Sequence, residues 1–300
     1  MLIFGHYDLL HVHWPEVFIR AKSRPRRAVK YFLFMLLLLR IKGSRIPVVR
    51  TLHNMTPHES FDAGFGRRLL SMLDSLTSVW ISLNPIVPDA IKANSTIILH
   101  GHYRDWFSSG IVPTEPGRIL FFGLVRPYKG VEELIQAFRA AERSLYSLRI
   151  VGRAESSQAA ESVGKLVLET PRVTARLEYI SDSELAEEVG QAELVVLPYR
   201  RMFNSGSAIL ALSLNRPILV PRNSVTVALA DEVGRSWVHL YDGQLRADHL
   251  SDAFAAIASL ADGPPPDLSR RDWTKAGIAL GGIYRSQWAS SLNPTPKEKI

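Results

Sequence analysis

Two short segments combine basic, small and polar residues in the way that anion-binding loops do. The first is Arg126-Pro-Tyr-Lys-Gly130, which follows an apolar run at residues 119–125, and the second is Asn204-Ser-Gly-Ser207, which follows an apolar run at 194–198. A helical stretch comes after each. A strand-to-helix loop offers free backbone N–H groups and the positive end of a helix dipole to an oxyanion. Together they favour a diphosphate site, although the first alone is equally typical of a solvated turn and the second of plain N-capping.

The elements that must position these loops form a regular α/β pattern. Strands are predicted at residues 9–14, 46–53, 78–82, 96–100, 119–125, 148–151, 176–180, 194–198, 217–220 and 236–240. Helices are predicted at 27–42, 67–76, 88–93, 130–141, 156–168, 208–213, 225–233, 250–260 and 273–288, with one more ending at Val189 that Ser181 or Ser183 caps. One strand–helix unit after another predicts two Rossmann-like, doubly wound parallel sheets, whose ligands bind at the carboxyl ends of the strands.

The chain length and its breakpoints predict two domains. A chain of 300 residues is long enough for two hydrophobic cores, and residues 111–118 hold two prolines and a glycine, as linkers do. We therefore expect an N-terminal domain over 1–112 and a second over 113–272. A helix over 273–290 is expected to cross back, and 291–300 to form a disordered tail.

Composition and charge exclude several classes of protein. The chain has no cysteine, so thiolate chemistry and disulfides are excluded, and its longest apolar run, residues 31–39, is too short to span a bilayer. The N-terminus does not read as a signal peptide. The net charge is +7, and residues 20–50 hold ten cations and no acid. Such a block favours phosphates, as found on lipid headgroups, nucleic acid or a phosphorylated substrate.

The predicted helix at 27–42 allows two interpretations. Its apolar residues fill every face from 31 to 39, which favours a buried crossover helix. The cations at its start, Arg24, Arg26, Arg27 and Lys30, favour a helix that lies on an anionic membrane surface. We expect both, with one face in the core and the basic end on lipid.

The second half of the chain resembles the nucleotide-sugar-binding domain of GT-B glycosyltransferases, in the large group that resembles family four. The resemblance covers about residues 118–260 and rests on the following segments, in this order: Phe121-Phe-Gly-Leu-Val-Arg-Pro-Tyr-Lys-Gly-Val-Glu-Glu-Leu134, Val151-Gly152, Leu194-Val-Val-Leu-Pro-Tyr199, Asn204-Ser-Gly-Ser-Ala208 and Ala211-Leu-Ser-Leu-Asn-Arg-Pro-Ile-Leu-Val-Pro221. The N-terminal half resembles the group more weakly, through residues 11–16 and 51–59.

The resemblance implies a role for each matching residue. Arg126 and Lys129 would neutralise the donor diphosphate, and Ser205, Gly206 and Ser207 would offer it backbone N–H groups. Gly152 and Arg153 would lie near the base or ribose, and Tyr199 and Asn204 complete the donor-binding set. No metal and no cofactor besides the nucleotide sugar is expected, because cations can stabilise the leaving diphosphate.

The sequence also departs from the group's pattern. Two glutamates that many relatives carry eight positions apart correspond here to Met202 and Leu210, and Arg200, Arg201 and Asn204 are candidates to replace them. The usual basic pair is separated by four residues and here by two. Nothing before Leu9 supplies the opening strand and glycine-rich loop of such folds, so the N-terminal domain is expected to be shortened.

The acceptor hydroxyl needs a base, and the N-terminal half offers candidates for it. His53, His58 and Glu59 follow a predicted strand and are the catalytic candidates, and His13, Glu16, His100 and His102 are expected on the acceptor side. Structural roles are equally typical of these histidines. Their spacing matches no metal-ligand motif.

The sequence therefore predicts a hexosyltransferase that uses GDP-mannose or a UDP-hexose. The expected acceptor is a glycolipid or polysaccharide at the cytoplasmic face of a bacterial membrane. A non-catalytic sugar-nucleotide-binding or partner subunit and a sugar-nucleotide epimerase remain alternatives. Nucleic-acid binding is not expected, because residues 20–50 lack an aromatic stacking platform.

Overall fold

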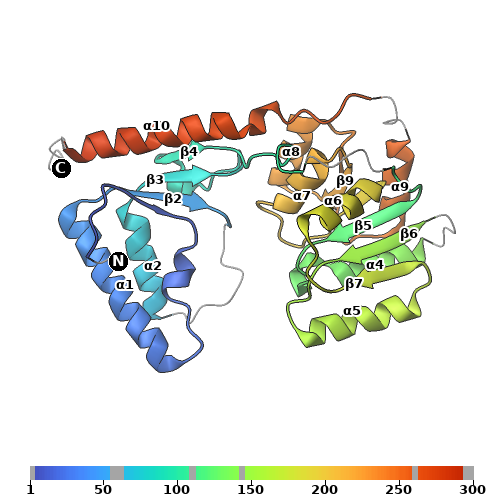
Figure 1. Ribbon diagram of the computed structural model, residues 1–300, viewed down its shortest axis with the longest axis horizontal. Helices are drawn as coiled ribbons and strands as arrows, with labels where there is room; N and C mark the ends of the chain where they lie inside the picture. The colour runs from blue at the N-terminus through green and yellow to red at the C-terminus, as the bar shows by residue number, and fades with distance from the viewer. Residues whose placement is uncertain (1–3, 55–63, 108–112, 142–145, 259–262, 293–300) are drawn as a thin grey trace. The chain divides into compact units, whose positions relative to one another are not determined.

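The computed structural model describes residues 4–54, 64–107, 113–141, 146–258 and 263–292, which form two α/β units (Figure 1). One unit comprises Met1–Leu99 with Trp273–Ile300, and the other His100–Asp272. The division at Trp273 coincides with the predicted start of the last helix. The other division precedes the boundary expected at residue 112, because residues after His100 bond to the second unit. Tyr103 N–H, for example, donates to Ser213 Oγ.

The first unit is built on a four-stranded sheet with the order β1-β2-β3-β4, in which neighbouring strands are parallel. Its strands are β1 (Leu10–Val12), β2 (Val48–Leu52), β3 (Thr77–Ser82) and β4 (Ser95–Ile97). Its helices are η1 (Pro15–Phe18), α1 (Arg24–Ser44), α2 (Phe65–Leu76), α3 (Asp89–Lys92) and α10 (Trp273–Leu292). Figure 1 shows α1 and α2 on one side of this sheet and α10 along the other.

Helix α1 supplies much of the first core. Phe34, Leu37, Leu38 and Ile41 recur at helical spacing and are buried, so they form one face. They pack with residues of α2 and with β1 and β2. The expectation that one face of this helix lies in the core is confirmed.

The second unit is built on a six-stranded parallel sheet with the order β10-β9-β8-β5-β6-β7. Its strands are β5 (Arg118–Phe122), β6 (Ser147–Val151), β7 (Val173–Arg176), β8 (Leu194–Val196), β9 (Ile218–Pro221) and β10 (Val238–Tyr241). Its helices are η2 (Pro127–Lys129), α4 (Val131–Ala140), α5 (Ser157–Glu169), α6 (Asp182–Gln191), α7 (Gly206–Ser213), α8 (Ser224–Val233), α9 (Ala247–Ile257) and η3 (Ser269–Arg271). This is the strand order of a doubly wound, nucleotide-binding sheet, so the predicted class of fold is confirmed.

The strand expected at 176–180 differs most from its prediction. A strand was expected at 176–180, but β7 ends at Arg176, where pairing with β6 ends at Val151. Residues beyond it lead into α6, where Ser181 is the N-cap and Glu184 completes a capping box. The alternation after Arg176 therefore belongs to a loop that enters a helix.

The expected tail lies mostly outside the described residues. Residues 291–292 continue α10, and 293–300 are not among those that the structure describes.

Candidate functional site

The strand order reverses between β5 and β8, which are neighbours in the second sheet. Ligands of such sheets bind outside the carboxyl ends of the strands at this reversal. The loops that leave the sheet there hold residues 123–130 after β5 and 197–205 after β8. They contain the first anion-binding segment that the sequence analysis selected and the start of the second, which continues into α7.

Glycine brings these two loops into contact. Gly130 has φ +68°, and a β-carbon built on it would lie 2.4 Å from the carbonyl oxygen of Pro198. The backbone N–H of Arg200 also donates to the carbonyl oxygen of Tyr128, at 2.9 Å. Any side chain at position 130 would separate the loops, so Gly130 allows Lys129 to reach the end of β8.

Lys129 points to a cluster of hydroxyl groups. Its Nζ lies 3.1 Å from Tyr199 Oη and 4.3 Å from the centre of the Tyr199 ring. A β-carbon built on Gly123 would lie 3.4 Å from this Nζ and 3.6 Å from Ser207 Oγ. The lysine and the first turn of α7 therefore meet at one point, above the end of β5.

Burial shifts the pKa values of this cluster. It lowers the pKa of Lys129, and the nearby Arg126 charge adds to the lowering. It also raises the pKa of Tyr199, whose hydroxyl bonds to Ser207. The ammonium is thus poorly solvated, and an anion would supply the interactions that water no longer does.

Helix α7 begins at the same point. Ser205 is its N-cap, and Ser205 Oγ accepts a hydrogen bond from Ala208 N–H at 3.2 Å. The N-capping interpretation of Ser205 is therefore confirmed. The other N–H groups of a first turn have no partner within their own helix, so the helix start can bind an oxyanion.

Two side chains from residues 100–107 reach the start of α7, which no local sequence signal indicated. A β-carbon built on Gly206 would lie 3.0 Å from Tyr103 Oη and 3.9 Å from His100 Nε2. His102 belongs to the same unit, where its N–H donates to Arg271 O. His100 and His102 were expected on the acceptor side, and the structure instead places both in the unit that holds the diphosphate loops.

Arg126 does not share the contacts described for Lys129. Its Nε lies 3.0 Å from Glu155 Oε1, and it lines a cavity of about 370 Å³ with Glu132, Ser156 and Arg200. The two cations of the first loop therefore have different surroundings.

The other expected donor-side residues occupy varied environments. Gly152 has φ +132°, and a β-carbon built on it would lie 2.3 Å from Gly123 O, so this position requires glycine. Arg153 is exposed and Asn204 half-buried. Met202 and Leu210, at the positions of the missing glutamates, are both buried in the core.

The first unit holds a cluster of histidines at the carboxyl ends of β1 and β2. His13 Nδ1 lies 3.0 Å from His53 Nε2, and Trp14 stacks on His53 with 4.3 Å between ring centroids. Two imidazoles joined in this way can hold and pass a proton. His58 and Glu59, the other catalytic candidates, lie outside the described residues.

His11, which the sequence analysis did not select, supports this pair. Its Nδ1 lies 2.6 Å from Tyr284 Oη of α10, and its Nε2 lies 2.8 Å from Thr51 Oγ1. Burial lowers the pKa of His11 to about 4, and the nearby His13 is the smaller cause of this lowering. A neutral imidazole at pH 7 therefore ties α10 to the sheet. Only the tertiary fold reveals it, because Tyr284 is remote in sequence.

Helix α1 leaves an apolar stripe without cover. Val29, Phe32, Leu33 and Leu39 are between 45% and 57% exposed. Of the four cations expected to contact a membrane, Lys30 has hydrogen-bond partners within the protein, because its Nζ donates to the carbonyl oxygens of Val17 and Arg20. Arg24 and Arg26 are exposed near the stripe's N-terminal end. Among the described residues, no helix is long and apolar enough to cross a membrane.

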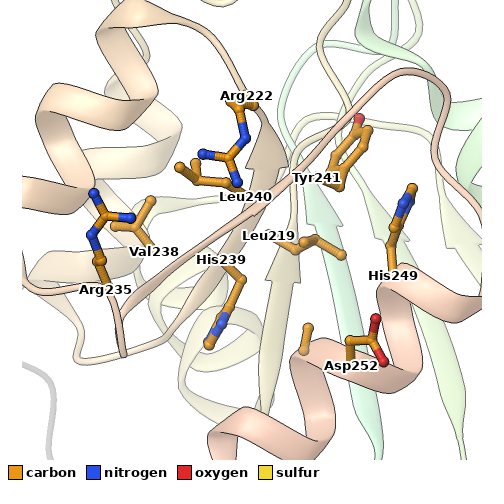
Figure 2. A pocket seen from close by; sticks show the side chains of 10 residues that line it. Leu219, Arg222, Arg235, Val238, His239, Leu240, Tyr241, His249 and Asp252 are labelled. Atoms are coloured by element: carbon orange, nitrogen blue, oxygen red, sulfur yellow. The ribbon is translucent and has the colours of Figure 1, made fainter.

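A smaller cavity of about 240 Å³ lies beside the edge strand β10 (Figure 2). Its arginines are ion-paired, Arg222 with Asp242 and Arg235 with Asp231. Strand β9 separates β10 from β8, so this cavity is not at the strand reversal. No group of three or more potential metal ligands occurs in the part of the chain that the structure describes.

Comparison with known proteins agrees with this architecture. Residues 116–258 match the family model for glycosyl transferases group 1. A GDP-mannose:glycolipid 4-beta-D-mannosyltransferase from Xanthomonas campestris pv. campestris is 45% identical over 277 residues, which are 92% of this chain and 78% of the relative.

Solved structures share the fold at low sequence identity. Anabaena HepE in complex with UDP and glucose matches with a TM-score of 0.65 and 14% identity, over 93% of this chain and 78% of that one. Sucrose-phosphate synthase from Thermosynechococcus elongatus matches with a TM-score of 0.64 and 18% identity, over 95% and 74%.

The expected resemblance is thereby confirmed. With a close relative matched over most of both chains and two parallel-sheet units of the GT-B type, this chain belongs to the group 1 glycosyltransferases.

Proposed function

We propose that this glycosyltransferase moves a mannosyl group from GDP-mannose to a glycolipid on a membrane surface. The observation that carries the proposal is the meeting of Lys129 and Ser207 at Gly123, where the strand order reverses. The Xanthomonas relative, which is named for this donor and acceptor class, supports the choice of sugar and base.

Lys129 carries the main donor role in this proposal. Its Nζ faces the N-terminus of α7, so both would contact the same diphosphate. Negative charge grows on the leaving diphosphate as the glycosidic bond breaks, and a preorganised cation stabilises that charge. Arg126 would need to leave Glu155 to join it. The expected roles of Gly152, Arg153, Tyr199 and Asn204 near the nucleotide remain part of the proposal.

His53 is proposed as the base for the acceptor hydroxyl, with His13 as its hydrogen-bond partner. The relative is named for a β-mannoside, and a β-linkage arises from an α-linked donor by one inversion. A single displacement needs one base on the attacking hydroxyl. The bond between His13 and His53 would stabilise the proton that is removed. Glu16, in η1 near the same strand end, remains a candidate for contact with the acceptor.

Helix α1 is proposed to hold the protein on the cytoplasmic face of the membrane. The exposed stripe would enter the interface while Arg24 and Arg26 contact anionic headgroups. Lys30 would act less directly, since its Nζ already donates to the carbonyl oxygens of Val17 and Arg20. Arg27 would add its charge from a half-buried position. A surface-bound enzyme could reach a lipid-linked acceptor without a membrane-spanning helix.

The test is a thermal-shift series with GDP, UDP, ADP and dTDP and their sugars, followed by transfer to an extracted glycolipid. We expect GDP and GDP-mannose to raise the melting temperature most, because a ligand of the native state stabilises it. Mannosyl transfer should appear by mass spectrometry. A larger shift with UDP-sugars and no mannosyl product would refute the donor.

A further inference from the structure

The chain around His100 and Tyr103 is fixed to the second unit by buried interactions. Arg271 donates to Glu232 at 2.8 and 2.9 Å, and both side chains are only 4% exposed. The same guanidinium donates to the carbonyl oxygen of His100 at 3.1 Å. Such a buried, ion-paired anchor holds the backbone of His100 in one place.

Tyr103 is held by a hydrogen bond from its backbone. Its N–H donates to Ser213 Oγ at 2.9 Å, so the residue bonds to the last turn of α7 while its hydroxyl lies at the first turn. The hydroxyl would lie 3.0 Å from a β-carbon on Gly206. The absence of a β-carbon at this position therefore lets the phenol approach the helix start.

The imidazole of His100 has a defined tautomer when it is neutral. Its Nδ1 lies 2.9 Å from Gly101 O, so Nδ1 carries the hydrogen and donates to that carbonyl. Nε2, on the side of Gly206, is then an acceptor. A phosphate oxygen is also an acceptor, so only the doubly protonated ring can donate to it through Nε2.

We propose that His100 and Tyr103 bind the donor diphosphate at the start of α7, and that His100 takes up one proton from solvent as the donor binds. This rests on the proposed function, because it assumes a diphosphate at that helix start. The phenol donates its hydrogen to one phosphate oxygen, and the newly protonated Nε2 donates to another. The site thus gains a positive charge only when the dianion is present.

The charges around His100 favour this coupling. Burial lowers the pKa of His100, the bond to Gly101 opposes this, and the Arg271 charge lowers it further. Arg271 is itself ion-paired with Glu232. Burial raises the pKa of Tyr103, which stays neutral. The α7 side offers the hydroxyls of Ser205 and Ser207, with Lys129 beyond Ser207. Without a bound donor, the imidazole of His100 is therefore neutral at pH 7, and a bound diphosphate raises its pKa.

The experiment is isothermal titration calorimetry of the full chain with GDP-mannose, whose diphosphate does not titrate between pH 6 and 8.5. Wild type is measured at several pH values and in two buffers of different ionisation enthalpy, which counts the protons taken up. For one linked proton, affinity falls by up to about tenfold for each unit rise in pH.

His100→Gln keeps an N–H donor near Nε2 but does not titrate, so we expect binding with a flat pH profile and proton uptake near zero. Tyr103→Phe should weaken binding about tenfold at every pH, as expected for the loss of a hydrogen bond to a charged group.

Matched variants separate the possible failures. His249→Asn keeps an acceptor for the Arg246 N–H, and Tyr179→Phe alters an exposed tyrosine in the same unit. Both should behave as wild type. Equal pH dependence and proton uptake in wild type and His100→Gln would overturn the role of His100, and unchanged affinity in Tyr103→Phe would overturn that of Tyr103. Failure of wild type itself to bind any nucleotide sugar would instead contradict the proposed function.

Discussion

Replacing Lys129 with methionine tests the donor site most directly. The variant keeps an unbranched side chain that is one atom shorter and removes its charge. Two unit charges about 4 Å apart attract by roughly 4 kcal/mol at an effective dielectric constant near 20, and a hydrogen bond to a charged group contributes about 1.5–3 kcal/mol net. We therefore expect a loss of about 2–3 kcal/mol in donor binding, which is a roughly 30- to 150-fold higher Kd.

Protein stability should change in the opposite sense to affinity. Burial lowers the pKa of Lys129, so the unfolded chain binds its proton more tightly than the native state does. The charged lysine therefore lowers the free energy of unfolding at neutral pH, and this cost disappears only as pH rises through the unfolded pKa. The loss of the contact with the Tyr199 ring partly offsets the gain. We expect Lys129→Met to melt at or above the temperature of wild type.

The assay combines calorimetry with GDP-mannose, initial rates of transfer and a melting curve. Lys165→Met is the matched control, because it removes an exposed lysine on α5 of the same unit. The reasoning is refuted if the Kd of Lys129→Met for GDP-mannose is within about threefold of the wild-type value. It is also refuted if a weaker affinity is accompanied by a clear fall in melting temperature.

Four further outcomes are expected. His53→Gln should lower kcat by about a hundredfold or more, with the Kd for GDP-mannose unchanged, because general-base catalysis contributes roughly 10²–10⁴ in rate; an equal fall in donor affinity would contradict that role. His11 has a pKa lowered to about 4, so its unfolded form binds more protons and the stability of wild type should fall as pH drops from 6.5 to 4; melting curves of His11→Gln should show a smaller fall, and an identical fall would count against it. Arg271→Met leaves a carboxylate buried without its cation and should lower the free energy of unfolding by about 3–5 kcal/mol, measured by urea denaturation; a change below about 1 kcal/mol would be inconsistent with a buried pair. The double substitution Phe32→Ser and Leu33→Ser should reduce sedimentation with anionic vesicles while melting stays unchanged, and undiminished sedimentation would exclude α1 as the contact.

Local sequence was enough to predict most strands and helices, because their signals lie within a few residues. Ser181 and Glu184 form the capping box that a serine followed by a glutamate indicates. The apolar content of α1 correctly predicted that one of its faces is buried, although apolar residues on every face did not show which one. The segments around Lys129 and Ser205 could also be identified as candidates, since a basic or small-residue loop before a helix can bind an oxyanion.

Strand pairing was less accessible to the sequence. β7 ends where its partner β6 ends, at Arg176 opposite Val151, and the neighbour's length cannot be read from the residues of β7 itself. The same holds for the placement of β5 beside β8, which creates the reversal that the two loops share. Pairing between distant strands depends on loop closure and packing across the whole sheet.

The sequence by itself determined that the chain forms alternating parallel strands and helices and that two of its loops suit an oxyanion. Only the tertiary structure decided which side chains meet there. It brought His100 and Tyr103 to the start of α7, and it joined His11 to Tyr284 on the last helix. The physical reason is that local propensities and caps act over a single turn or strand, whereas these contacts form between residues that only the packed sheets bring together.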